Sequence, residues 1–302
     1  MSASPAIPAP LSVRPDPPGP SPDRQDEGAA PAPAATFNAG FLLEMIVCEA
    51  HWCVMQVATI AILSSACARP EATYSLRSCR YLLHNDVAIM LLALRYGDEI
   101  GLRADDVAKL AGLYRGVAEA QKSLLPMTAL PVLSATQRNA LKSHAAVWRR
   151  LAAQAGTAIA QIEASTRARL NGYYHKDAET LRHYLRRAAD GDMSDVDASG
   201  VVRTPELTQR RKSPRVAIDG TCVLILPTGS IRARLNDVSL NGLSVTAEQP
   251  LEARQKLVVA LEDGRKLEAV VVRRQGAKAG LSLRHSLKAT DPLFRSGEAP
   301  AA

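Results

Sequence analysis

The spacing of hydrophobic positions divides the chain into a helical part and a strand-rich part. From residue 37 to about residue 189, apolar residues recur three and four positions apart, which is the period of one helix face. After Gln209 the apolar residues fall in short, partly alternating runs rich in Val, Leu and Ile, which is typical of strands. The pattern therefore predicts an α+β multidomain protein, with an N-terminal all-α helical domain followed by a β domain.

Four helical stretches are predicted before residue 190. They cover residues from about 41 to 63, 78 to 96, 104 to 125 and 134 to 188. Pro70 and Gly97 follow the first two stretches, and Pro126 follows the third, as expected where helices end.

The last helical stretch carries a seven-residue repeat. The repeat consists of Leu141, Trp148, Ala155 and Ile162, with Ala145, Ala152 and Ile159 at the complementary positions. Such a seam packs either inside a bundle of the same chain or against a second copy, and the repeat is compatible with both.

Six strands are predicted in the β part. They span residues 216–226, 231–238, 243–247, 257–261, 267–273 and 281–284, and Gly-containing turns lie between several of them. Six short strands at this spacing indicate a small antiparallel barrel or sandwich.

The composition of the chain predicts the remaining domain and linker boundaries. Residues 1–36 contain ten of the 19 prolines and too few apolar residues to offset chain ordering, so we expect a disordered arm. The helical domain is expected over 37–189, an acidic and glycine-containing linker over 190–208, the β domain over 209–288, and a disordered tail over 289–302.

The net charge of +7 is concentrated in two basic blocks. Residues 138–187 hold ten Lys and Arg against three Asp and Glu, and residues 209–288 hold fifteen against seven. An excess of this size favours anionic partners, although the first block is equally compatible with a solvated helix surface.

Five cysteines, an odd number without regular spacing, argue against a disulfide framework and for reduced, buried thiols in the cytoplasm. The first 20 residues contain no continuous apolar run of the kind found in signal peptides. The most apolar segment, residues 53–67, is shorter than the roughly 20 residues that a membrane span requires, so we interpret it as a buried helix. We therefore expect a cytoplasmic protein without a membrane span.

Two short motifs lie in the β part. Gln209–Val216 contains two arginines four positions apart, Arg211 and Arg215, just before the first strand. About 20 residues later, Asn236–Leu243 contains an Asp-x-Ser-x-x-Gly pattern between two strands. This arrangement, together with a late Gly280-Leu-Ser-Leu283 element, resembles the PilZ domain family over about 80 residues, from Gln209 to near His285.

The resemblance implies a six-stranded antiparallel β-barrel that binds the second messenger cyclic di-GMP. It implies that the ligand residues are Arg211, Arg215, Asp237, Ser239 and Gly242, and that Arg210 accompanies binding of a stacked pair of ligands. These residue types suit the ligand, because guanidinium groups fork onto phosphates and guanine, and a carboxylate accepts from the donor edge of guanine. A glycine allows close backbone approach or a positive φ.

The same residues have a plainer interpretation. The arginines could form a solvated basic linker, and the Asp-x-Ser-x-x-Gly pattern could form a hairpin turn whose side chains cap the backbone.

The sequence gives only weak signals for a metal site and none for a catalytic motif. Glu44, Cys48 and His51 share one helix face with Cys53 nearby, but core thiols and a buried histidine are the favoured interpretation over a metal site. No nucleophile elbow, phosphate-binding loop or zinc-protease pattern is present, so we predict a non-enzyme without a cofactor.

The functional hypothesis is a cyclic di-GMP receptor that transmits binding to a helical output or oligomerisation domain. The alternative is an interaction adaptor whose barrel does not depend on ligand. A protein partner or self-association through the helical domain fits both hypotheses. Nucleic-acid binding through residues 138–187 is not favoured, because no interleaved aromatic residues or recognised motif support it.

Overall fold

The structure is a computed structural model that describes residues 38–72, 75–83, 87–130, 132–209 and 213–295. The predicted disordered arm, residues 1–36, lies outside the described residues. Of the predicted tail, residues 289–295 are described, and they include a short 3₁₀ helix, η2 (Pro292–Phe294), whose Phe294 side chain is buried.

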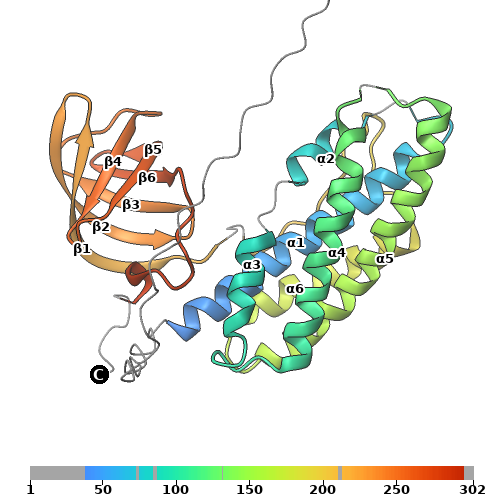
Figure 1. Cartoon of the computed structure of the whole chain (residues 1–302), viewed down its shortest axis with the longest axis horizontal. Coiled ribbons are helices and arrows are strands. Elements are labelled where there is room, and N and C mark those ends of the chain that lie inside the picture. The colour runs from blue at the N-terminus through green and yellow to red at the C-terminus, as the bar shows by residue number, and fades with distance from the viewer. Residues whose placement is uncertain (1–37, 73–74, 84–86, 131, 210–212, 296–302) are drawn as a thin grey trace, which may run out of the picture. The chain divides into compact units, whose positions relative to one another are not determined.

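The described N-terminal part is all-α (Figure 1). Its elements are α1 (Ala39–Cys67), α2 (Arg77–Leu82), α3 (Val87–Ala93), the 3₁₀ helix η1 (Leu94–Tyr96), α4 (Ala104–Thr128), α5 (Ala135–Thr166) and α6 (Gly172–Asp190). The prediction of an all-α N-terminal part is confirmed.

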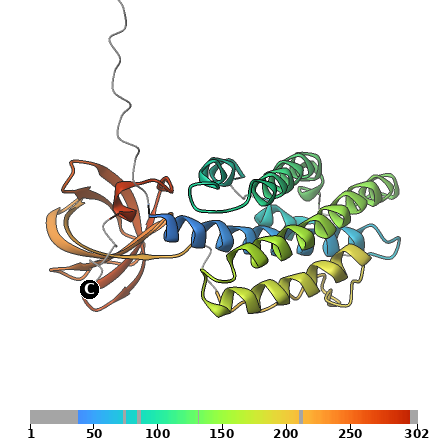
Figure 2. The ribbon, with the colours of Figure 1, turned by 90° about the horizontal axis from the view of Figure 1, so that it is seen from below.

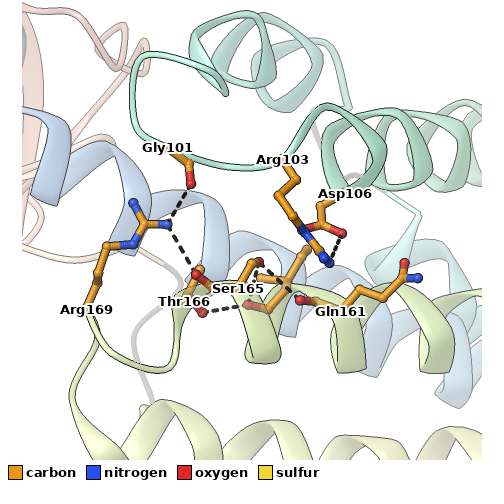
Figure 3. Close-up of polar contacts among 8 residues, drawn as sticks. Gly101, Arg103, Asp106, Gln161, Ser165, Thr166 and Arg169 are labelled. Carbon is orange, nitrogen blue, oxygen red and sulfur yellow. Dashed lines mark hydrogen bonds and ion pairs between the residues drawn. The ribbon is translucent and has the colours of Figure 1, made fainter.

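The prediction of one helical stretch over 134–188 was wrong, because the chain breaks between α5 and α6. Asn171 has an extended backbone at the N-cap of α6, with φ −63° and ψ 146°. The Arg169 guanidinium donates to the Ile100 carbonyl. It also donates to the Gly101 carbonyl at 3.1 Å, and these contacts tie the break to the loop before α4 (Figure 3 shows the bond to Gly101). At its other end α5 begins with a capping box between Ser134 and Gln137.

Two further helix boundaries differ from expectation. The stretch predicted over 78–96 consists of α2, α3 and η1 among the described residues. Pro126, expected to end the preceding helix, lies inside α4, which continues to Thr128. Pro126 has no N–H to donate to the carbonyl four residues earlier, yet the helix continues for two more residues.

The heptad seam of α5 lies inside the chain's own core. All seven seam residues are at most 3% exposed, and α5 packs against α1, α4 and α6. Figure 2 shows α1, α5 and α6 running side by side. Of the two packings that the repeat allowed, burial within the chain's own bundle is the one observed.

Helix α1 is the core of this bundle. It has 29 residues, so by length and composition it could cross a membrane, and the argument from a 15-residue apolar segment was wrong. In the structure, however, 89% of its most apolar 18-residue window is buried. This burial accords with the interpretation of a core helix.

All five cysteines are free and buried. Burial raises the pKa of Cys48 and Cys67 to about 12 and that of Cys222 to about 11, because desolvation penalises the thiolate. These side chains are therefore protonated at neutral pH and pack as small apolar groups.

The described C-terminal part is a closed antiparallel barrel with strand order β1-β2-β3-β6-β5-β4. Its strands are β1 (Val216–Leu226), β2 (Gly229–Ser239), β3 (Gly242–Ala247), β4 (Lys256–Leu261), β5 (Lys266–Gln275) and β6 (Lys278–Leu283). Alternate residues point inward, and the fully buried ones are Leu224, Val238, Val245, Val259 and Val271. The six predicted strands are confirmed, and they close into a barrel.

Candidate ligand-binding site

The Asp-x-Ser-x-x-Gly motif forms the hairpin turn between β2 and β3. Ser239 pairs with Gly242, which leaves Leu240 and Asn241 as the two turn residues. The Ser239 hydroxyl donates to the Gly242 carbonyl at 3.3 Å, so the side chain helps to close the turn. Just before the turn the register shifts between Leu235 and Asp237, which places a β-bulge at the start of the motif.

A glycine is needed at position 242 because the backbone of β6 passes very close to it. Its φ is not positive, but a Cβ at this position would lie 2.7 Å from the Leu281 carbonyl oxygen on β6. Of the two roles expected for this glycine, the structure shows the first. Gly242, at the start of β3, pairs with Ser282 on β6. The Asp-x-Ser-x-x-Gly motif therefore lies beside the Gly280-Leu-Ser-Leu283 element, which forms part of β6.

We expect Gly242→Ala to destabilise the barrel by about 1–3 kcal/mol, because the added methyl group overpacks against a backbone atom that cannot move independently. Gly220→Ala is the matched control, since a Cβ there meets only Leu235 Cδ1 at 3.8 Å. Urea unfolding of both variants measures the difference. Equal stability of the two would contradict the close-approach role.

The arginine motif leads directly into β1. Arg210 and Arg211 lie outside the described residues, so the structure does not place these two candidate residues. Arg215 is described, and its Nη1 donates to Asp237 Oδ1 at 2.9 Å, with both side chains 28% exposed. The two motifs, 22 residues apart in sequence, therefore meet at this ion pair.

Ser213 makes a second link between the motifs, and the sequence did not single it out. Its side chain is buried, and its hydroxyl oxygen accepts from the Leu240 backbone N–H at 3.4 Å. The only sequence signal for this role is a small polar residue placed before a proline inside a basic run.

The end of β6 and the segment after it pack on the same turn. Leu283 N–H donates to the Asn241 carbonyl at 2.9 Å, and Leu287 N–H donates to the Leu240 carbonyl at 2.8 Å. The Asn241 and Ser286 side chains are also hydrogen bonded. The turn is thus fixed from both sides, which presents Arg215 and Asp237 on a rigid platform.

The discounted metal site is not assembled in the structure. Among the described residues, no group of three His, Cys, Asp or Glu side chains is placed to hold a metal ion. Cys48 Sγ donates to Tyr174 Oη at 3.6 Å, and burial lowers the pKa of His51 to about 4. These contacts fit the core interpretation.

Comparison with known families agrees with the geometry. Residues 209–292 match the family model of the PilZ domain, and the helical part lies outside the match. A search of curated proteins gives no match. The closed barrel thus lies in the stretch that matches the PilZ domain, and that domain indicates a family that binds cyclic di-GMP.

Proposed function

We propose that this chain is a cyclic di-GMP receptor whose PilZ domain transmits binding to the helical domain. The observation that carries the proposal is the Arg215–Asp237 ion pair, which brings both motifs to one end of the barrel beside the ordered β2–β3 turn.

Among the described residues, the Arg215–Asp237 contact leaves hydrogen-bonding groups of both side chains available for a ligand. A guanidinium carries five N–H donors and a carboxylate has two acceptor oxygens, while the contact between them uses one donor and one oxygen. Arg215 can therefore turn donors toward a phosphodiester or guanine, and Asp237 can accept from guanine N1–H and N2–H₂. We propose that Arg210, Arg211, Ser239 and Gly242 complete the ligand set.

The alternative function is an adaptor with a ligand-independent barrel. One observation favours it: Asp237, Ser239 and Gly242 each have a partner or a packing role within the barrel itself. Calorimetric titration of the full chain with cyclic di-GMP separates the two functions, since the adaptor gives no binding heat.

We propose a cytoplasmic bacterial protein that is not an enzyme and needs no cofactor. Its helical domain, residues 37–189, binds a protein partner or a second copy and does not span a membrane. Residues 190–208 join it to the PilZ domain.

We predict a binding plateau near two ligands per chain. A stacked pair of ligands carries four phosphate charges, which Arg211 and Arg215 only half neutralise, and a third guanidinium at Arg210 can stack on or bond to the outer ligand. Arg210→Leu should lower the calorimetric plateau toward one. A wild-type plateau at one would contradict this role for Arg210 while leaving the receptor proposal standing.

A further inference from the structure

A buried carboxylate of the helical domain binds the backbone just before the arginine motif. Asp177, on α6, is 1% exposed. Its Oδ1 accepts from Thr208 N–H at 2.7 Å, and its Oδ2 accepts from Gln209 N–H at 2.8 Å. Both oxygens of one side chain thus hold two consecutive peptide groups that lie outside the helix.

These bonds are short and charge-assisted, and the carboxylate that accepts them is buried. A buried carboxylate is costly unless donors satisfy it, and here the chain after α6 supplies them. We therefore treat the contact as a clamp, the Asp177 clamp, formed by Asp177, Thr208 and Gln209.

The chain reaches the clamp by returning along α6. It leaves the helix at Asp190, about 20 Å along the helix axis from Asp177. The first part of the returning segment is held by Arg187, which forms ion pairs with Asp192 at 2.9 Å and Asp195 at 2.8 Å. A backbone bridge joins Val196 to Val202, and the Leu207 side chain is buried. The segment is therefore attached to the helical domain as far as Gln209.

Very little chain separates this attachment from the PilZ turn. Ser213 already contacts the Leu240 N–H, so only residues 210–212 lie between two fixed points. Four Cα–Cα steps of about 3.8 Å reach at most about 15 Å, so the Cα atoms of Gln209 and Ser213 lie within about 15 Å of each other. Two of its three residues are the proposed ligand arginines, Arg210 and Arg211.

We propose that Asp177 is a positioning residue for cyclic di-GMP binding, through which the helical domain fixes the backbone that enters the arginine motif. This inference rests on the proposed function. Holding the backbone at Thr208 and Gln209 preorganises the start of the arginine motif, which lowers the conformational entropy lost on ligand binding. By linkage, bound ligand must in turn stabilise the clamp.

Two variants of the full chain test the clamp from opposite sides. Asp177→Asn keeps the side-chain shape but sets an NH₂ group against one backbone N–H. Thr208→Pro removes one of the two N–H donors and leaves α6 unchanged, so it separates the clamp from the stability of the helix. Glu179→Gln is the matched control, because it removes an exposed carboxylate two residues further along α6.

The first measurement is amide hydrogen exchange without ligand. We expect at least tenfold faster exchange at Gln209 in both variants and no change in the control. Unchanged exchange in both variants would overturn the clamp, whether or not the chain binds cyclic di-GMP.

The second measurement is calorimetric titration with cyclic di-GMP. We expect both variants to bind at least fivefold more weakly, the lower end of typical coupling of about 5- to 150-fold, and the control to match wild type. Exchange at Gln209 should also slow on ligand addition in wild type. Equal or tighter binding by both variants would overturn the positioning role. A wild-type chain that does not bind would instead overturn the proposed function. The exchange measurement would still show whether the Asp177 clamp forms.

Discussion

Replacing Arg215 by alanine is expected to weaken cyclic di-GMP binding by about tenfold to a hundredfold, since each hydrogen bond to a charged group contributes about 1.5–3 kcal/mol. The substitution also leaves the Asp237 carboxylate without its guanidinium partner next to an anionic ligand. The same loss is expected for Arg211→Ala. Calorimetric titration of the purified variants measures it.

Arg234→Ala is the control for charge alone. Arg234 lies on β2 and pairs at 3.0 Å with Asp219, and both side chains are well exposed. Its removal lowers the positive charge of the barrel by the same amount but touches neither motif, so affinity should change little at physiological salt. If Arg215→Ala and Arg211→Ala bind as wild type does, the assignment of the arginine fork is wrong.

Replacing Trp148 by alanine is expected to destabilise the helical domain by about 3–5 kcal/mol, because it empties the largest side-chain volume in the α5 seam. Trp148 is 0% exposed, and its indole N–H has no hydrogen-bond partner among the described residues. The side chain therefore acts through packing, and Trp148→Phe should cost much less. Denaturant unfolding followed by helical circular dichroism measures both variants.

Trp148→Ala also tests where the seam packs. If the seam is internal, as its burial against α1, α4 and α6 indicates, wild-type stability should not depend on protein concentration. A cost for Trp148→Ala below about 1 kcal/mol, or a midpoint that rises with concentration, would contradict the internal bundle.

The strands could be predicted closely because alternation is a local property. The bounds of each predicted strand lie within three residues of the observed bounds. Closure into a barrel was expected only through the family resemblance, because short alternating runs are equally compatible with a sandwich.

The break between α5 and α6 was not predicted, although the turn-forming dipeptide Asn171-Gly172 lies at the start of α6. The residues just before it gave no such signal. Residues 167–170 are Arg, Ala, Arg and Leu, all good helix formers. Arg169 also holds the chain there by donating to the carbonyls of Ile100 and Gly101, which lie almost 70 residues earlier.

The geometry of the candidate site also depends on tertiary contacts that sequence patterns do not reveal. The motifs identified Arg215 and Asp237 separately, but the ion pair between them depends on the β1–β2 register, in which Ala217 lies opposite Asp237. In sequence, Asp177 looks like one more charge on an amphipathic helix. Its role follows from burial and from the returning chain, neither of which a helical period encodes.

The most direct test of the receptor function is calorimetric titration of the full wild-type chain with cyclic di-GMP, beside the double variant Arg211→Ala and Arg215→Ala. We predict saturable binding by the wild type and no measurable heat of binding for the variant, with the barrel still folded by circular dichroism. A wild-type chain that shows no saturable binding up to about 1 mM ligand, where the binding free energy would be weaker than about −4 kcal/mol, would contradict the account.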